Sequence, residues 1–148
     1  MSGSRGFAIR HAETADAAAI AALCTQLGYP VEAEVIARRL DRLLKLPTQA
    51  VFVACDEDDA VHGFVATEQR LILEIGDRVE VVALVVDEAA RRHGAGRALM
   101  TAAELWAHKR GVSEVFLRSN VLRAESHPFY ESLGYARTKT QHAYARSL

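Results

Sequence analysis

A long β-branched stretch that runs into a glycine-rich turn constrains the fold of this chain more than any other feature. Residues 78–86, RVEVVALVV, are expected to form a strand buried on both faces. Residues 91–100, RRHGAGRALM, follow with two glycines one residue apart and then a helix-forming run. A glycine-rich turn between a buried strand and a helix N-terminus binds phosphate, because glycine lets the backbone approach and the first amides of the helix point at the anion. The sequence therefore predicts a local anion site at this turn.

The rest of the chain predicts helices and strands in the order βααβββαβαβ. Periodic apolar residues favour helices, alternating and β-branched runs favour strands, and Gly28, Pro30 and Pro47 separate the early elements. This order is typical of an α/β domain with a mixed sheet. The expected strands are 7–10, 50–55, 60–70, 78–86, 114–118 and 135–145, and the expected helices are 17–27, 31–44, 96–109 and 129–133.

Length and charge limit what the chain can be. At 148 residues it is long enough to bury a core, and we expect a single domain over residues 1–148. The formal net charge of −1 excludes a general attraction to nucleic acid or to an anionic membrane. No apolar run reaches the ~20 residues of a membrane span, and the start MSGSRGFAIR lacks the apolar core of a signal peptide. We expect a cytoplasmic protein without a nucleic-acid or membrane partner.

The cysteines and histidines suggest neither covalent nor metal chemistry. Cys24 and Cys55 lie far apart with no CxxC spacing, on a predicted helix and a predicted strand, so we interpret both as reduced core residues. The six histidines form no metal-ligand spacing, and we expect no metal.

Two common phosphate-binding motifs fail at the glycine loop. A Walker A loop needs lysine and then serine or threonine after its second glycine, but Arg97 and Ala98 follow Gly96. A dinucleotide fingerprint needs a third small residue three positions after Gly96, where Leu99 stands. A phosphate ligand of this loop would therefore be of another kind, and the alternative for Gly94 and Gly96 is an ordinary tight turn between a strand and a helix.

Two motifs resemble those of the GNAT superfamily of N-acetyltransferases. The pattern Arg-x-x-Gly-x-Gly at 91–96 resembles the loop that holds the pyrophosphate of acyl-CoA, and SNVLRAESHPFYESLGY at 119–135 is similar to the second signature of the family. The predicted element order also matches over nearly the whole chain. The resemblance implies the GNAT fold, a mixed and mostly antiparallel sheet of about six to seven strands flanked by helices.

The resemblance implies acetyl-CoA as cosubstrate and a set of residues that bind it. The backbone of the central strand would pair with the pantetheine arm, an amide at Leu84 would polarise the thioester carbonyl, and Asn120 would bond the pantetheine or nearby backbone. The predicted cofactor-binding residues are Leu84, Val85, Val86, Arg91, Arg92, His93, Gly94, Ala95, Gly96, Arg97 and Asn120.

Glu80 and Tyr130 are the predicted catalytic residues. Glu80 stands in a valine-rich strand eleven residues before Arg91, the offset of the catalytic glutamate in the histone-acetylating branch of the family. The alternative for Glu80 is an exposed strand start paired with Arg78. Tyr130 matches the family tyrosine that protonates the leaving thiolate, and its alternative is a buried structural role. Because Pro128 precedes it closely, we expect the helix of Tyr130 to begin only at residue 126 or 127.

The resemblance implies transfer of an acetyl group to a primary amine, by direct attack through a tetrahedral intermediate. A non-catalytic acyl-CoA-binding sensor or partner-binding module of the same fold is the alternative. Tyr29 and Glu74 are predicted to contact the acceptor, a small-molecule or peptide amine. Aminoglycosides, polyamines, amino-acid derivatives and protein amines all stay open. The resemblance also suggests a homodimer, whose interface the sequence does not identify.

Overall fold

The computed structural model describes residues 6–148 apart from 120, 122 and 124. The chain divides into two compact units, with the boundary between Leu117 and Arg118. The first unit holds one sheet and most of the helices, and the second holds one short helix and an extended tail. Each unit is described by itself below.

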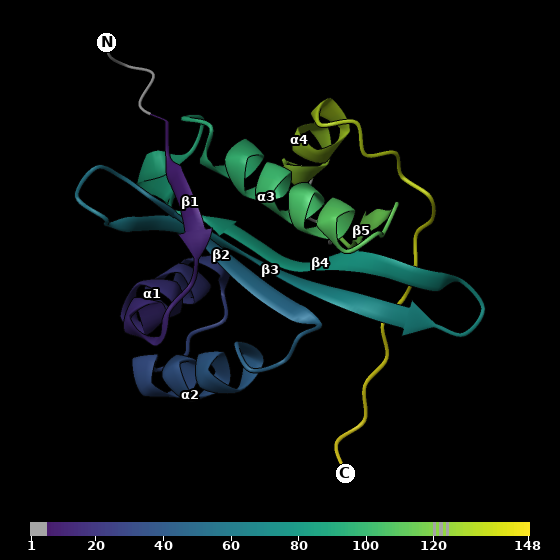
Figure 1. The fold of residues 1–148 in the computed structure, drawn as a ribbon, viewed down its shortest axis with the longest axis horizontal. Coiled ribbons are helices and arrows are strands. Elements are labelled where there is room, and N and C mark those ends of the chain that lie inside the picture. The colour runs from purple at the N-terminus through teal and green to yellow at the C-terminus, as the bar shows by residue number, and fades with distance from the viewer. Residues whose placement is uncertain (1–5, 120, 122, 124) are drawn as a thin grey trace. The chain divides into compact units, whose positions relative to one another are not determined.

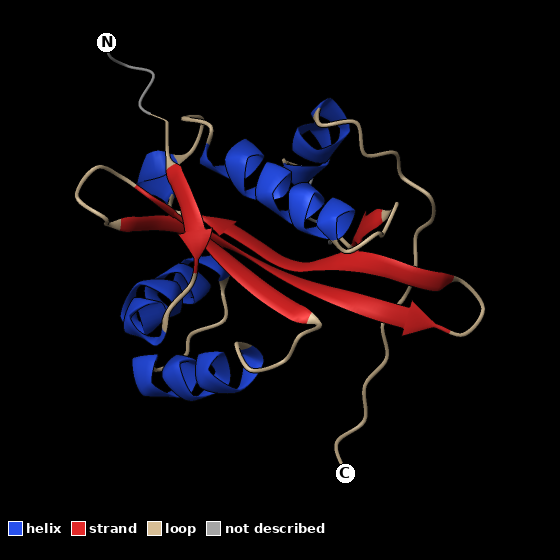
Figure 2. Ribbon diagram, viewed as in Figure 1, coloured by secondary structure: helices blue, strands red, loops and turns tan. Residues whose placement is uncertain are grey.

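A single five-stranded sheet organises the first unit, and its strand order is the order of the chain (Figures 1 and 2). The first four strands pair antiparallel, whereas the last pairs parallel to its neighbour. The longest ladder is the hairpin of the third and fourth strands, which turns at residues 73–75. The strands are β1 (Ala8–His11), β2 (Gln49–Cys55), β3 (Val61–Ile72), β4 (Gly76–Val86) and β5 (Val115–Leu117).

Helices cover both faces of the sheet. The helices α1 (Ala17–Leu27) and α2 (Ala33–Leu43) lie on one face, and α3 (Ala95–Lys109) lies on the other (Figure 1). Short 3₁₀ turns at Thr14–Asp16 and Glu88–Ala90 lead into α1 and towards α3. This is the three-layer arrangement in which a sheet buries both of its apolar faces.

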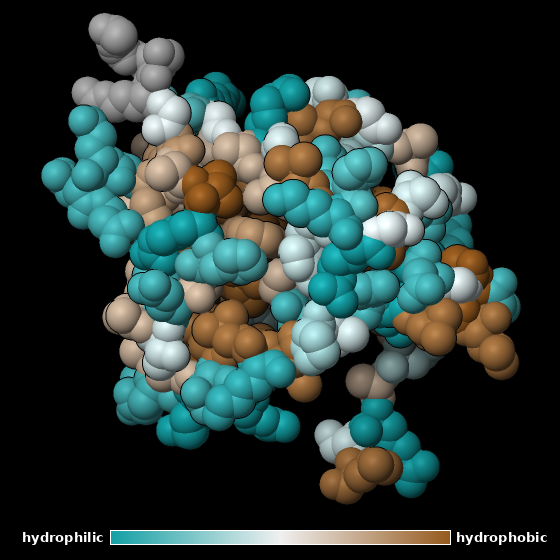
Figure 3. All heavy atoms as spheres, viewed as in Figure 1, coloured by the Kyte–Doolittle hydropathy of each residue, from teal (hydrophilic) through white to brown (hydrophobic). Residues whose placement is uncertain are grey.

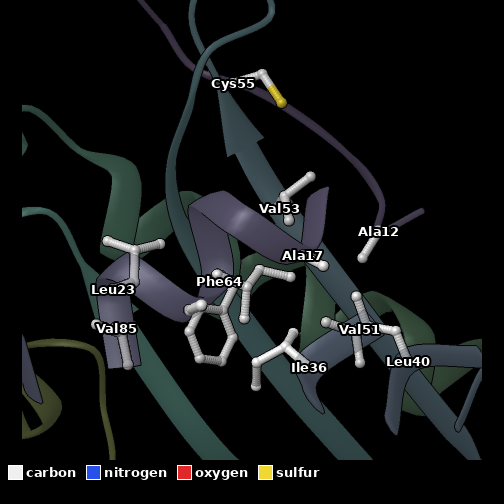
Figure 4. Packing of buried hydrophobic residues seen from close by; sticks show 12 residues of the cluster. Ala12, Ala17, Leu23, Ile36, Leu40, Val51, Val53, Cys55, Phe64 and Val85 are labelled. Atoms are coloured by element: carbon white, nitrogen blue, oxygen red, sulfur yellow. The ribbon is translucent and has the colours of Figure 1, made fainter. Parts of the chain in front are cut away.

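The larger core cluster lies between the sheet and the helices α1 and α2 (Figure 4). Helix α2 contributes its few apolar positions to this core and turns its arginines to solvent, as an amphipathic surface helix does. The buried side chains include Ile20, Leu23, Ile36, Leu40, Val51, Val53, Phe64 and Val85. A smaller cluster joins Val79 to Ala107 and Val112 on the side of α3.

A one-residue bulge in β4 reverses which side chains face which helices. In the ladder with β3, Thr67 pairs with Val81 and Ala66 pairs with Ala83, so Val82 has no partner and is half exposed. Before the bulge, odd-numbered residues such as Val79 face α3. After it, odd-numbered residues such as Val85 face α1 and α2.

The hairpin of β3 and β4 ends in an apolar tip. Leu71, Leu73 and Ile75 are all exposed there. Figure 3 shows brown spheres gathered around this end of the hairpin. The side chains of the tip therefore lie outside both core clusters.

The predicted α/β class and the mixed, mostly antiparallel sheet are confirmed, but the strand count of six to seven is wrong. The last predicted strand, 135–145, does not form, and the described residues 135–148 contain no strand. Residues 136–148 are all exposed, and their two largest apolar side chains, Tyr144 and Leu148, are among them. A strand is stabilised by burying one face, and this segment buries none.

An ion pair between Arg10 and Asp16 holds β1 to the start of the first helical segment. Two guanidinium nitrogens donate to the two carboxylate oxygens of Asp16, at 2.8 and 2.9 Å. The same carboxylate accepts from the backbone amide of Glu13 at 2.7 Å. The hydrogen bonds from Arg10 hold the pKa of the buried Asp16 carboxyl below its usual range.

The substitution Asp16→Asn should lower the free energy of unfolding at pH 7 by about 2 kcal/mol, because charge-assisted hydrogen bonds are lost. Since the folded-state pKa of Asp16 is depressed, its contribution is present above the unfolded pKa and is lost as the pH falls through the folded value. Urea unfolding of both proteins should therefore show a difference that shrinks below about pH 4. Asp41→Asn, which removes only an exposed pair with Lys45, is the control and should change little. If both substitutions lowered the free energy of unfolding equally, the stabilising role of the Arg10–Asp16 ion pair would be contradicted.

Candidate functional site

The N-terminus of α3 presents amide groups with no acceptor inside the helix. Gly94 is the residue that precedes the helix, with φ at 90°, and no side chain caps the helix end. The first bond of the helix runs from the amide of Ala98 to the carbonyl of Gly94, at 3.0 Å. The amides of Ala95, Gly96 and Arg97 come before this bond, so they are available to an outside acceptor. With the helix dipole, they form a helix end of the kind that binds anions.

Positive side chains surround this helix end. Arg91, Arg92 and Arg97 are all exposed, as is His93. The Nε of Arg91 donates to the carbonyl of Val86 at 3.4 Å, which ties the arginine to the end of β4. Arg92 adopts a φ of 70°, in the left-handed region. In a chain whose net charge is −1, this is a local concentration of positive charge.

A shallow groove of about 420 Å³ adjoins the same loop. It runs along α3 beside Ile9 of β1 and is mainly apolar. Its lining residues are Ile9, Gly94, Arg97, Ala98, Thr101, Ala102 and Leu105. A ligand held at the helix N-terminus therefore has apolar surface within reach of its uncharged parts.

The second half of β4 has a strand on one side only. β5 pairs with residues 79–81 and no further. Residues 83–86 continue to pair with β3, but no strand of the described chain pairs with them on the β5 side. Leu84, Val85 and Val86 belong to this stretch. Their backbone edge can accept an extended ligand as a further strand does.

Glu80 lies on the sheet face opposite α3, in a network of polar side chains. It is buried, and its Oε1 accepts a hydrogen bond from Arg70 at 3.0 Å. Arg70 also approaches Glu68, with Nε 3.7 Å from Oε1, and Glu68 accepts from Gln49 at 2.8 Å. The sheet register sets these contacts, because Glu80 stands directly opposite Glu68.

Glu80 pairs with Arg70. The alternative prediction, in which Glu80 stands at an exposed strand start and pairs with Arg78, is therefore wrong. Arg78 stands opposite Arg70 in the register and is itself buried. Sequence reasoning missed Arg70, although one signal was present. If the hairpin turns near residue 74, then Glu68 faces Glu80 and Arg70 faces Arg78, so charged residues are symmetric about the turn.

Arg78 packs against an aromatic ring. Its guanidinium carbon lies 3.7 Å from the ring centroid of Phe116 in β5, a close cation–π contact. Its Nε is buried and has no hydrogen-bond partner. Among the described residues, none forms a hydrogen bond or an ion pair with this guanidinium.

Tyr130 belongs to the second unit, on the helix α4 (Ser126–Ser132). The helix begins at Ser126 as predicted, and Pro128 is its third residue, where the missing amide costs no intrahelical bond. The ring of Tyr130 packs edge-on against Phe129 and Tyr135, with centroids 5.2 and 6.4 Å away. Burial raises the pKa of Tyr130, so the phenol is protonated at neutral pH. The remaining motif residue, Asn120, lies outside the described residues.

The two predicted acceptor residues are exposed. Tyr29 follows Gly28 in the loop between α1 and α2, and 68% of its surface is accessible. Glu74 lies in the turn of the β3–β4 hairpin. Glu80 stands four residues beyond the start of β4, which is about 13 Å along a strand. The structure does not bring Glu74 next to Glu80.

Both cysteines have thiols of low reactivity. Both are free, with Cys55 buried and Cys24 partly buried. Burial raises the pKa of each thiol, and thiols with raised pKa values are weak nucleophiles at neutral pH.

Comparison with known proteins identifies the family. Residues 15–135 match the family model described as the acetyltransferase (GNAT) family. The chain belongs to the GNAT acetyltransferase family. The match covers both predicted motifs, at 91–96 and at 119–135. The predicted family is therefore confirmed.

Two curated relatives are similar over most of their length. One is an aminoglycoside N(6')-acetyltransferase type 1 from Stenotrophomonas maltophilia, 30% identical over 135 residues, which cover 88% of this chain and 87% of the relative. The other is an uncharacterized N-acetyltransferase, YhdJ, from Bacillus subtilis, 25% identical over 114 residues, with 76% and 80% coverage.

A solved structure shows the same fold. The aminoglycoside N-acetyltransferase AAC(6')-Iy, in complex with CoA, superposes with a TM-score of 0.85, covering 96% of this chain and 95% of that chain. The sequences are 18% identical, so this likeness concerns the fold alone. Within the described part of this GNAT chain, no helix is long and apolar enough to cross a membrane.

Gly94→Ala should destabilise this GNAT protein by about 1 to 2 kcal/mol, because alanine is strained at positive φ. No atom lies within 4 Å of the position that its Cβ would occupy, so backbone strain is the only cost. Gly94→Asn is the control, since asparagine tolerates the left-handed region and should cost less. Thermal unfolding of the three proteins measures the difference, and equal losses for both variants would contradict the explanation.

Proposed function

We propose that this GNAT protein is an N-acetyltransferase that moves an acetyl group from acetyl-CoA to a primary amine, with residues 1–148 acting as one domain. The observation that carries the proposal is the backbone anion site at Gly94–Arg97, placed at the end of a strand with an open edge. The family match runs across the boundary between the two units, which supports one functional domain. The relatives named as N-acetyltransferases support the reaction class.

The residues at the α3 N-terminus fit the pyrophosphate of CoA. Three amides precede the first helical bond, and three arginines stand around them. Amides bind an anion without the need for an ordered side chain, and guanidinium groups add charge and paired donors. We assign pyrophosphate binding to Arg91, Arg92, His93, Gly94, Ala95, Gly96 and Arg97.

The open edge of β4 fits the pantetheine arm. Pantetheine carries amide groups that can bond to a strand edge, and residues 84–86 supply such an edge. An amide of Leu84 directed at the thioester carbonyl would stabilise the negative charge that develops on its oxygen. Asn120 is assigned to the same arm on the family motif alone.

Glu80 is proposed as the base. In the reaction, the amine nitrogen bonds to the acetyl carbon, the carbon–sulfur bond breaks, and the amine loses a proton. A primary amine is mostly protonated at neutral pH, so a base has to take a proton, directly or through water. Glu80 is the buried carboxylate of β4, and its bond to Arg70 fixes its position.

Tyr130 is proposed to give a proton to the departing sulfur. Its raised pKa supports the protonated form that a proton donor requires. Direct transfer from CoA to the amine is favoured, since neither cysteine is activated as a nucleophile. The aminoglycoside acetyltransferase relative supports a small-molecule acceptor, which Tyr29 and Glu74 are proposed to contact. The homodimer stays a prediction.

CoA and acetyl-CoA should each raise the melting temperature in a saturable way. At 100 times Kd a ligand adds about 2.7 kcal/mol, which is several degrees for a domain of this size. Replacing both Arg91 and Arg92 with Gln should weaken the affinity at least about tenfold. Lys109→Gln, which removes one positive charge at the opposite end of α3, is the control and should bind normally. If neither ligand shifts the transition and calorimetry detects no binding, the proposed function is wrong.

Glu80→Gln should lower kcat/KM about 100-fold or more while acetyl-CoA still binds, because the base is lost. The rate that remains should follow the fraction of free amine and so rise towards pH 10. Thiol release measured across pH 6–10 tests this. Asp58→Asn, on the turn between β2 and β3, is the control. An unchanged pH profile in the Gln variant would remove Glu80 as the base. If acetyl-CoA binds but no amine causes release of the CoA thiol, the result would favour the non-catalytic sensor.

A further inference from the structure

We propose that the acceptor amine carries a carboxylate within a few bonds of its nitrogen, as amino acids do, and that Arg78 binds this carboxylate. The inference deepens the proposed function and rests on it. It starts from Arg78, the charged residue on the face of Glu80 that has no polar partner in the described chain.

Arg78 is buried and yet unsatisfied. Only 8% of its surface is accessible, and its Nε has no hydrogen-bond partner. A buried N–H donor without an acceptor is costly, so a ligand that supplies the acceptor to Nε gains binding free energy. The ring of Phe116 holds the guanidinium by one face, at 3.7 Å, and leaves its in-plane donors to pair with an anion.

The other charged groups around Arg78 are already paired. Arg70 pairs with Glu80 at 3.0 Å and approaches Glu68 at 3.7 Å, and Gln49 donates to Glu68. At the register positions of β3 and β4 described here, the charges of Arg70 and Arg78 balance those of Glu68 and Glu80. These four positions therefore carry no excess negative charge to attract a polycation, whereas Arg78 offers an anion the Nε that has no partner.

The spacing suits a molecule with both charges. Arg78 and Glu80 lie two residues apart on the same face of β4, before the bulge, which is about 7 Å between their Cα atoms. A hydrogen bond of about 2.9 Å from each side chain leaves room for a short segment between them. An amine whose carboxylate is close by can thus meet Glu80 with its nitrogen and Arg78 with its carboxylate.

The test compares pairs of acceptors that differ only in the carboxylate. Thiol release from acetyl-CoA is measured with amino acids, each assayed beside its decarboxylated amine, such as lysine beside cadaverine and phenylalanine beside phenethylamine. Kanamycin is included as a polycation. We expect kcat/KM to favour the best carboxylated member over its partner about 10- to 100-fold. The substitution Arg78→Gln should reduce this ratio towards one, and Arg78→Lys should retain part of it.

Both values of kcat/KM in each ratio are measured with the same protein sample. A smaller folded fraction lowers both equally and leaves their ratio unchanged. Lys109→Gln is the charge-matched control and should keep the wild-type ratio. If decarboxylated amines or kanamycin are acetylated best, or if Arg78→Gln leaves the ratio unchanged, the inference is overturned while the acetyltransferase function stands.

A second readout does not need turnover. The same pairs are titrated by calorimetry into protein saturated with CoA. If a carboxylated amine binds the wild-type protein and Arg78→Gln abolishes this binding, the inference is supported. This holds even if no thiol is released, because the absence of thiol release would overturn only the transferase activity. Equal binding of both members of every pair, or binding of neither, overturns the inference.

Discussion

The bulge at Val82 lets one strand serve two cores and a polar face. A regular strand would send Val79, Val81 and Val85 to the same side of the sheet. With one residue inserted, Val79 packs in the cluster below α3 and Val85 packs in the cluster of α1 and α2. The same shift places Arg78 and Glu80 on the face opposite α3, where charged residues of β3 meet them. Both core clusters and the polar network therefore depend on this irregularity.

Much of the fold was predictable because its signals are local. The β-branched run 78–86, the glycine loop and the amphipathic pattern of α2 each determine a segment without reference to distant residues. The bulge was not predictable, because the alternation of residues 78–81 passes into the continuous apolar run 82–86, which has no alternation to reveal the extra residue. The prediction of a last strand at 135–145 was wrong for a related reason. Its local residue preferences favoured a strand, but the segment has no face that the fold buries.

The candidate site also has one part that the sequence predicts and one part that depends on the fold. The uncapped N-terminus of α3 was readable from sequence because it depends on where glycine falls relative to a helix start. The ion pair of Glu80 depends on the register of a hairpin, which a turn without a strong glycine signal leaves open. Arg70 and Arg78 look alike in sequence, two cations near a strand. Their opposite circumstances, one paired and one without a polar partner, follow only from the fold.

The N-terminus of α3, whose first amides have no acceptor inside the helix, has a consequence for the way this protein tolerates substitution. Its donors belong to the backbone, so a substitution at the exposed Arg97 leaves the amides in place, whereas the buried Ala95 has no room for a larger side chain. The conformation of Gly94 and the direction of the helix axis set where these amides point. The side-chain network around Glu80 lacks this tolerance, because each member depends on a particular partner. If the proposed function holds, the part of the site that binds CoA can therefore change in sequence with less loss than the part that binds the acceptor.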